Sequence, residues 1–381
     1  MNVLRLLLPP GAWRTLLPFT ALALWSGLPE ASTGLSGHLL NFAICGLGLL
    51  PLAVALSHLV EQLVARLGAR LGGLVSAMLG NLVEFLVAFN ALTSGLYPLV
   101  VMSIAGSVVI NCLAVLGIGI VIACRGRRSV TVNPVNQELA NQQLMISAIL
   151  LAVPSVFYNK PLNDALQGNN SADSFSLYSS LVAVLALLVY GLALVFGSNE
   201  TSQHPAEDAG TEPPLSERGS LAPLLTALSG LTILVALVSD RLVDALQQMV
   251  EGAHLSPLFV GLFLLPLFGC LPEALVAWRA ARRRQISLIM TSTVESSLQL
   301  LLFVLPLLVL CGLPLNRHLH LGLPPVALAA LAIAVVMIER ITANHRLNSY
   351  EGMQLLVLFL VLALGALLLI SPTSVAAAVA L

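Results

Sequence analysis

The stretch GNLVEFLVAFNAL, residues 80–92, lies inside the run that sets the class of this protein. Between Leu71 and Ala123 the run contains no Lys, Arg, Asp or His, and its one carboxylate is Glu84. A transmembrane helix needs about 20 consecutive apolar residues, so the run is long enough for two membrane spans. A charged side chain at the bilayer centre costs about 2.5 to 3.5 kcal/mol. Glu84 is therefore a candidate functional group inside a membrane protein.

The composition of the whole chain agrees with this interpretation. Of its 381 residues, 58% are hydrophobic and 9% are charged, whereas soluble domains carry about 25% charged residues. Cutting the sequence at charges and at Pro, Gly or Asn clusters leaves candidate spans at 12–27, 38–59, 70–93, 96–124, 141–158, 175–198, 221–239, 257–279, 286–312, 323–339 and 353–371. We therefore expect an all-α polytopic membrane protein with about eleven transmembrane helices. The first is interpreted as a span, because no small-residue cleavage site follows it.

The basic residues predict the orientation. With a cytoplasmic N-terminus, only Lys160, Arg241 and Arg317 of the 17 Lys and Arg fall outside. This bias follows the positive-inside rule and comes chiefly from CRGRR at 124–128 and RAARRR at 279–284. Because these clusters have a topological role, they do not indicate a nucleic-acid partner. We expect a protein of the bacterial plasma (inner) membrane with a cytoplasmic N-terminus, and the sequence leaves a homo-oligomer open.

The chain divides into two halves of opposite orientation. The acidic segment at 199–220 is rich in Pro, Ser and Gly and lacks apolar periodicity, which is typical of a linker. Five spans precede it and five follow it, and an odd number of spans per half inverts the second half. We expect an N-terminal segment with the first helix at 1–37, a five-helix repeat at 38–198, the cytoplasmic linker, and a second five-helix repeat at 221–381.

A faint sequence repeat supports the two halves. GNLVE at 80–84 corresponds to GCLPE at 269–273, an offset of 273 − 84 = 189, and this offset also carries Ser107 onto Ser296. Inverted repeats place their shared site at the bilayer midplane, on broken helices. Pro272 favours such a break, because it removes a helical donor. Glu84 and Glu273 are therefore a candidate midplane pair, which costs about 5 to 7 kcal/mol when both are charged and unpaired.

Helical spacing places further polar residues beside this pair. Asn81 shares a helix face with Glu84, and Ser107 shares one with Asn111. A stripe in the second half is formed by Ser292, Glu295, Ser296 and Gln299. A lone Ser or Asn in a membrane helix usually makes a hydrogen bond to a neighbouring helix that is worth about 0.6 kcal/mol. Glycines in such helices usually allow close helix packing. The two carboxylates, which are costly to bury, carry the stronger functional signal.

The residues around Glu84 resemble a known family. LVARLGARLGGLVSAMLGNLVEFLVAFNALTSG, followed by GSVVINCLAVLG, is similar to the first repeat of the calcium/proton exchangers of the cation/proton exchanger family, in the cation/calcium antiporter superfamily. LSPLFVGLFLLPLFG, SSLQLLLFVLPLLVL and NSYEG at 348–352 resemble the second half. The resemblance runs in order along nearly the whole chain from about residue 38.

The resemblance implies an antiporter rather than an enzyme. Its two repeat glutamates, Glu84 and Glu273, would bind Ca²⁺ at the midplane and release it when protonated. Gly80 and Asn81 would supply backbone and amide oxygens. Ser107, Asn111, Ser296, Ser297 and Gln299 would line the cavity. Ca²⁺ takes about 6–8 oxygen ligands, which suits such a mixed set. No cofactor is implied: the partners are Ca²⁺, protons and the lipid bilayer.

The second motif departs from the family pattern. Where the family has Gly-Asn-Ala-x-Glu-His, this chain has GCLPEA at 269–274, so an amide and a histidine are missing. Glu295 stands where the family's Gly-Ser-Ser-x-Gln pattern has its glycine, and we expect it to face the cavity as a ligand or a proton carrier. Exchange of another divalent cation, Na⁺-driven exchange and a degenerate, non-transporting scaffold remain open alternatives.

Other chemistries have little support in the sequence. No nucleophile–base pair or multi-histidine motif suggests an enzyme. The cysteines contain no CxxC spacing and predict neither a disulfide framework nor a zinc site. We interpret them as packing residues: Cys45, Cys112, Cys124, Cys270 and Cys311.

Overall fold

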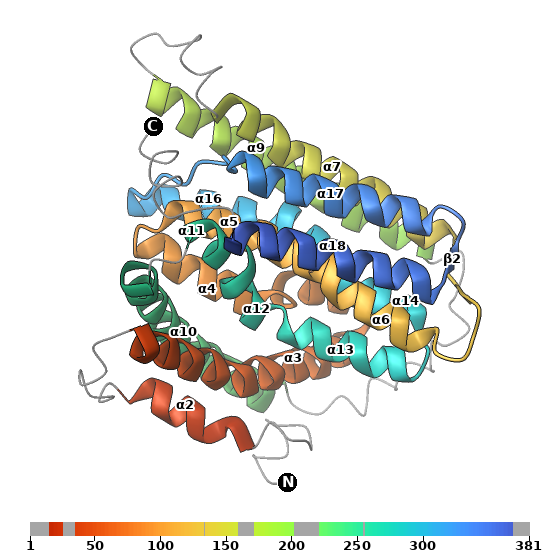
Figure 1. Ribbon diagram of the computed structural model, residues 1–381, viewed down its shortest axis with the longest axis horizontal. Helices are drawn as coiled ribbons and strands as arrows, with labels where there is room; N and C mark the ends of the chain where they lie inside the picture. Colours follow the sequence, from red (N-terminus) through yellow and green to blue (C-terminus); the bar gives the residue numbers. More distant parts are fainter. Residues whose placement is uncertain are drawn as a thin grey trace.

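A computed structural model of the chain describes residues 15–25, 35–132, 134–158, 171–201, 221–253 and 256–368. These residues are almost entirely helical (Figure 1). The N-terminal segment contains α2 (Leu17–Leu24). The first half contains α3 (Leu35–Leu79), α4 (Leu82–Thr93), α5 (Tyr97–Val109), a π-helical segment (Ile110–Val115), α6 (Leu116–Ala123), β1 (Val130–Thr131), α7 (Pro134–Tyr158) and α9 (Ser171–Thr201). The second contains α10 (Ala222–Ala253), α11 (Pro257–Phe259), a π-helical segment (Val260–Leu264), α12 (Leu265–Gly269), α13 (Leu271–Arg282), α14 (Ile286–Met290), a π-helical segment (Thr291–Glu295), α15 (Ser296–Gln299), a π-helical segment (Leu300–Val304), α16 (Leu305–Gly312), a 3₁₀ turn (Leu313–Leu315), α17 (Pro325–Thr342), β2 (Arg346–Leu347) and α18 (Ser349–Leu368).

The helices confirm the all-α membrane class but not the expected count of eleven spans. Within the described residues, eight helices are long and apolar enough to cross a membrane, and the bent pair Val260–Gly269 and Leu271–Arg282 makes nine. α2, with 8 residues, and α4, with 12, are each too short to span alone. Parts of the expected spans at 12–27 and 353–371, and linker residues 202–220, lie outside the described residues.

Two helices extend beyond their predicted ends. The gap at 60–69 between the candidate spans 38–59 and 70–93 is not a loop, because apolar residues such as Leu63 continue the buried face of α3. α3 is nevertheless not straight: a Cβ on Gly72 would lie 2.7 Å from the Val64 carbonyl oxygen, although eight residues of straight helix rise about 12 Å. α10 continues past residue 239 because residues such as Leu242 remain buried while Asp244 faces outwards.

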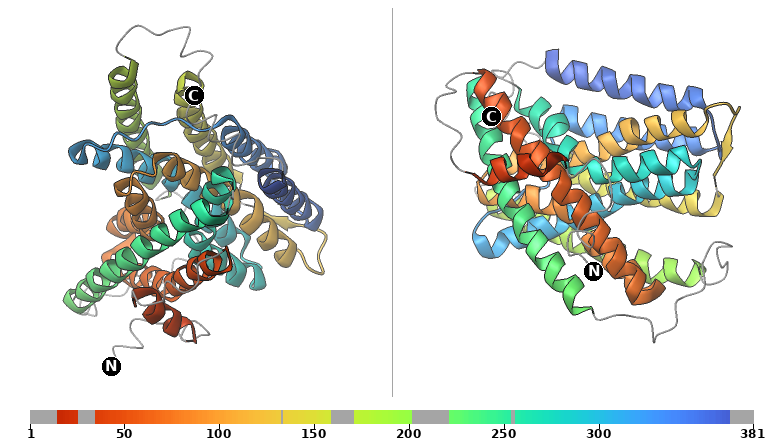
Figure 2. Two further views of the ribbon diagram at one scale, coloured as in Figure 1. Left: turned by 60° about the vertical axis from the view of Figure 1, so that its left-hand side comes forward. Right: turned by 90° about the horizontal axis from the view of Figure 1, so that it is seen from below.

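The first helices of the two halves, α3 and α10, cross on one side of the molecule (Figure 2). α2 covers α3 from outside, and its Thr20 Oγ1 donates to the Gly48 carbonyl at 2.7 Å. α4 is tied to α10 where Asn90 Nδ2 donates to the Ala236 carbonyl at 2.9 Å. α7 and α9 lie at the opposite edge, with α4–α6 and α12–α17 in between (Figure 1). The interior of the bundle is thus built from helices of both halves.

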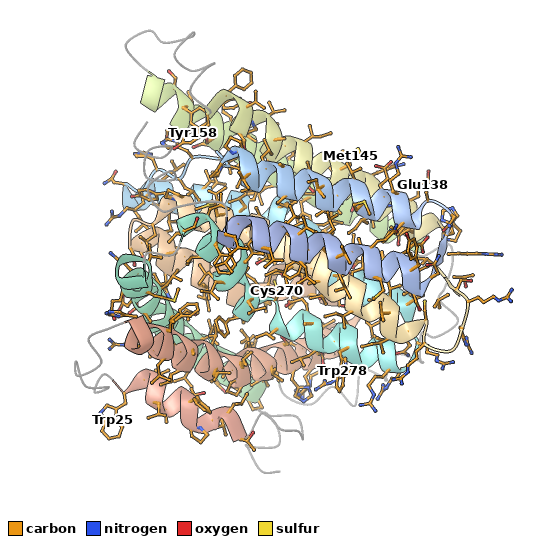
Figure 3. The ribbon with its side chains drawn as sticks, viewed as in Figure 1. Trp25, Glu138, Met145, Tyr158, Cys270 and Trp278 are labelled. Carbon is orange, nitrogen blue, oxygen red and sulfur yellow. The ribbon has the colours of Figure 1, made fainter. Side chains whose placement is uncertain are left out.

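The two ends of the bundle differ in charge. β1 and β2 pair antiparallel with Val130 opposite Leu347, which joins the loop after α6 to the loop after α17. Arg284 Nη2 donates to the Arg125 carbonyl at 3.4 Å, so two arginine clusters meet at this end. We call it the arginine-rich end. Trp278 lies towards it, Trp25 and Tyr158 lie towards the other end, and Cys270 lies between (Figure 3). Aromatic side chains near both ends are typical of membrane interfaces.

Candidate cation-binding site

Two helix breaks lie at repeat-equivalent positions. Gly80 and Asn81 separate α3 from α4, and Cys270 separates α12 from α13, where the axis bends by 62°. The repeat offset gives 81 + 189 = 270, so the breaks coincide. Each break is followed by a glutamate in the first turn of the next helix, Glu84 in α4 and Glu273 in α13. The two halves therefore present their carboxyl groups in the same local geometry.

Local sequence explains both breaks. Pro272 lies in the first turn of α13, where its missing N–H is tolerated, and it leaves the Phe268 carbonyl without an i+4 donor. In the first half the backbone turns at Gly80, where a Cβ would lie 2.6 Å from the Ser76 carbonyl oxygen. A Cβ on Gly269 would lie 3.2 Å from Cγ of Glu84. Gly269 of the second half thus leaves room for the side chain of Glu84 from the first half.

The structure brings Glu84 and Glu273 together in the interior. Their side chains are 5% and 9% exposed, and the two carboxyl groups lie close enough for a hydrogen bond between them. Such a bond needs a proton on one of them, because an ionised carboxylate only accepts. Glu84 Oε1 and Glu273 Oε2 have no hydrogen-bond partner. Buried carboxyl oxygens are costly without a partner, and a bound cation would satisfy them.

Asn81 links the first break to the third helix of the second half. Its Nδ2 donates to Oε1 of Gln299 at 2.7 Å, and its Oδ1 accepts from Oγ of Ser296 at 2.7 Å. Gly80 lies against the same amide, since a Cβ there would be 3.3 Å from Gln299 Oε1. The Asn81 oxygen keeps one free lone pair. Four residues expected from the sequence thus converge, and the Asn81 oxygen is available as a ligand.

Ser297 and the backbone of Ser107 take part in contacts between helices. Ser297 Oγ donates to the Thr293 carbonyl at 2.7 Å and lies 3.5 Å from Sγ of Cys112. The Ser107 carbonyl accepts a hydrogen bond from Sγ of Cys270 at 3.6 Å. Both serines are buried. The Cys270 thiol, which occupies the position of the family's amide, is therefore engaged by the first half.

Asn111 is fully buried, and neither atom of its amide has a hydrogen-bond partner. It lies in the π-helical segment Ile110–Val115, and the repeat offset carries residue 111 to 111 + 189 = 300, the start of the π-helical segment Leu300–Val304. π-Helical turns are frequent at functional sites. An unpaired buried amide at such a turn favours a role as a ligand, either to a cation or to a bound water.

Glu295 is not in contact with the carboxyl pair. Its side chain is exposed, and its electrostatic neighbour is Tyr190 of α9. Gln299 and Glu295 lie four residues apart on one helix, yet of these two side chains only Gln299 is hydrogen-bonded to Asn81. The sequence analysis missed Tyr190, for which the only signal was a single polar-tipped ring in an apolar span.

The oxygen donors near the two breaks suit a hard cation. They comprise the two carboxyl groups and the Asn81 amide, and Pro272 leaves the Phe268 carbonyl beside the second break without an i+4 donor. Among the described residues, no group of three or more His, Cys, Asp or Glu could hold a metal ion. Transition metals favour imidazole and thiolate ligands, whereas Ca²⁺ favours carboxylate and carbonyl oxygens. The site thus fits a transported divalent cation better than a resident zinc ion.

Known proteins resemble this chain along most of its length. It is 32% identical to the vacuolar calcium ion transporter of Schizosaccharomyces pombe over 330 residues, 85% of this chain and 78% of that protein. It is 30% identical to the Ca²⁺/H⁺ antiporter ChaA of Bacillus subtilis over 332 residues, 86% and 92% of the two chains. It is 29% identical to the Ca²⁺/H⁺ antiporter of Aphanothece halophytica over 364 residues, 92% and 93% of the two chains.

Solved structures share the fold. The structure of native YfkE matches with a TM-score of 0.74 and 23% identity, covering 93% of this chain and 99% of that one. The H⁺/Ca²⁺ exchanger CAX matches with a TM-score of 0.62 and 13% identity, covering 92% and 86%. These structural matches show a shared fold, and a family model confirms the family resemblance expected from the sequence. Residues 37–198 and 223–368 match the family described as sodium/calcium exchanger protein, and the chain belongs to that family.

Proposed function

We propose that this protein is a Ca²⁺/H⁺ antiporter. The observation that carries the proposal is the buried pair of Glu84 and Glu273, which lie close enough for a hydrogen bond at repeat-equivalent helix breaks. The names of relatives in Bacillus subtilis and Aphanothece halophytica support Ca²⁺ and H⁺ as the exchanged ions.

Competition between Ca²⁺ and protons for one pair of carboxylates suffices for exchange. Two carboxylates are neutralised either by one Ca²⁺ or by two protons, so both loaded states are neutral. The empty, doubly charged pair costs about 5 to 7 kcal/mol at mid-bilayer. The site therefore crosses between its two access states loaded rather than empty, and the flux of one ion is coupled to that of the other.

The other donors have distinct roles in this proposal. Glu84 and Glu273 bind the cation and the protons, the Asn81 oxygen and the Phe268 carbonyl complete the oxygen ligands, and Asn111 holds a ligand or its water. Gln299 and Ser296 orient the Asn81 amide through the two 2.7 Å hydrogen bonds. Glu295, which lies beside Tyr190, carries protons rather than binding the cation.

The arginine-rich end is assigned to the cytoplasm by the positive-inside rule. Export of Ca²⁺ from a bacterial cytoplasm is then the direction of transport. The two five-helix halves are residues 38–198 and 221–381, and the acidic linker at 199–220 lies on the cytoplasmic side.

The proposal is tested by radioactive Ca²⁺ uptake into inside-out membrane vesicles. An imposed pH gradient should drive uptake, an equal Na⁺ gradient should not, and Mn²⁺ and Zn²⁺ should compete less well than unlabelled Ca²⁺. Uptake driven by Na⁺ alone would favour Na⁺-driven exchange, and preferred transport of Mn²⁺ or Zn²⁺ would favour another divalent cation. Absence of any driven uptake by the folded protein would favour the non-transporting scaffold.

A further inference from the structure

A pocket lies between α3 and α13, away from the ligands described above. Its walls are Val54, Ser57, His58 and Glu61 from α3, and Pro272, Leu275, Val276 and Arg279 from α13. On each helix these residues follow the spacing i, i+3, i+4, i+7, which defines one helix face. The pocket is therefore a groove between two facing stripes, about 10 Å long, since seven residues of helix rise that far.

The groove has a closed end and an open end. Val54 and Pro272 are buried, whereas Glu61 and Arg279, seven residues further along each helix, are exposed. α13 ends at Arg282, next to the loop that contacts Arg125, so the groove opens at the arginine-rich end. Its closed end reaches Pro272, which directly precedes Glu273 in the chain. The groove thus leads from the surface towards the carboxyl pair.

The polar groups of the groove lie near its open end. His58 Nδ1 is 3.8 Å from Oε2 of Glu61, whose side chain is 65% exposed. Ser57 adds a hydroxyl on the same wall, and Arg279 stands on the facing wall. One carboxylate therefore lies inside a passage whose surroundings are rich in arginine, where cations would otherwise be repelled.

We infer that this groove is the vestibule through which the cation travels between the arginine-rich end and the carboxyl pair. The inference rests on the proposed cation transport. Glu61 attracts the cation at the mouth, Ser57 offers an oxygen further in, and Arg279 opposes entry. The groove stops at Val54 and Pro272, two residues from the break at Cys270. A movement of α13 at this break opens the last step to Glu273.

Neutralising Glu61 or Arg279 at the mouth tests the vestibule, because the two substitutions should change the KM for Ca²⁺ in opposite directions. Glu61→Gln should raise the KM for Ca²⁺ about tenfold at low ionic strength, because steering by one charge is lost. Arg279→Gln should lower the KM. Both effects should shrink at about 0.15 M salt, where charges are screened beyond about 8 Å. Maximal rates should stay near the parent's, since neither residue belongs to the midplane site. A merely structural role would lower the maximal rate of both variants.

Thiol labelling tests the path directly. Ser57→Cys should react with a positively charged, membrane-impermeant methanethiosulfonate applied to inside-out vesicles, and the reaction should inhibit transport. The matched control is Ser287→Cys on α14, which is exposed and lies outside the groove, and whose labelling should leave transport unchanged. The parent with its native cysteines is treated in parallel, because Cys311 is partly exposed.

The two proposals fail separately. Ca²⁺ should slow the labelling of Ser57→Cys in purified protein but not that of Ser287→Cys, and this readout needs no transport. If the parent does not exchange ions but Ca²⁺ protects Ser57→Cys, the antiport proposal fails and the vestibule stands. If the parent exchanges ions while Ser57→Cys is labelled without inhibition or protection, the vestibule is overturned.

Discussion

The first and second halves of this protein break a helix at the same repeat position but provide different side chains there. Asn81 holds the first break against the second half through hydrogen bonds to Gln299 and Ser296. Its equivalent, Cys270, is a buried thiol that donates to the Ser107 carbonyl. A buried cysteine packs as a small hydrophobic residue with a weak donor. Backbone geometry and the carboxyl groups thus follow the repeat, whereas the remaining oxygen donors come mainly from the first half.

The largest expected effect is a loss of Ca²⁺ uptake that should be the same in both halves. Glu84→Gln and Glu273→Gln should each reduce pH-driven Ca²⁺ uptake at least about a hundredfold, a loss of about 3 kcal/mol, because Gln keeps the side-chain volume but can neither neutralise Ca²⁺ nor carry a proton. Glu138→Gln, at an exposed site on α7, is the matched control and should transport normally. Normal uptake by either site variant in correctly folded protein would remove the carboxyl pair from the mechanism.

The next largest effect should differ between the halves, because Asn81 and Cys270 occupy equivalent positions but make different contacts. Asn81→Ala removes two hydrogen bonds between the halves and should lower the free energy of unfolding by about 1 to 2 kcal/mol, with a weaker apparent affinity for Ca²⁺. Cys270→Ser keeps a donor near the Ser107 carbonyl and should leave transport within about twofold of the parent. For each variant, thermal unfolding in detergent measures the stability and the KM for Ca²⁺ measures the apparent affinity. Equal losses in the two variants would mean that Cys270 is also a ligand.

A smaller effect is expected at Glu295, which lies beside Tyr190 rather than in the carboxyl pair. Glu295→Gln should leave the KM for Ca²⁺ within about twofold of the parent's while it alters the pH profile of the rate, since a proton carrier acts on proton transfer and not on cation binding. A large rise in KM would instead place Glu295 among the cation ligands. A parent-like rate and pH profile would leave Glu295 with only a structural role in contacts between helices.

The smallest effect concerns stability at the end opposite the arginine clusters. His320, in the loop before α17, packs against Phe175 with ring centroids 5.3 Å apart. Burial, and secondarily the charge of His318, hold the pKa of His320 below its usual value of 6.5. The folded state therefore binds this proton less well than the unfolded state. Stability should be complete above about pH 6.5 and decrease as the pH falls below it.

Thermal unfolding measured from about pH 5 to pH 8, a range that spans the usual histidine pKa, checks this effect. His320→Gln should flatten the acid side of the stability profile without changing the pH dependence of transport. An unchanged stability profile would mean that His320 does not titrate differently in the folded and unfolded states. The variant also separates acid effects on folding from proton effects at the carboxyl pair.

Much of the candidate site could be predicted from the sequence because its rules are local. Pro272 and Gly80 mark the breaks through backbone chemistry, and Glu84 and Glu273 stand out because charge is costly in a bilayer. Helical spacing placed Ser296 and Gln299 on one side of their helix. The prediction that the spans at 38–59 and 70–93 are separate was wrong. The charges between them lie on the exposed side of one continuous helix, α3, whose other face stays buried.

The sequence by itself determined the membrane class and singled out Glu84 and Glu273 as buried acids, since hydropathy and charge act within a helix turn or a span. Only the tertiary structure decided which side chains meet. Asn81 and Gln299 are 218 residues apart in the chain, and the groove between α3 and α13 needs both helices in place. Glu295 shares a helix side with Gln299, yet it lies beside Tyr190, because contacts in a helical bundle depend on how whole helices pack against each other.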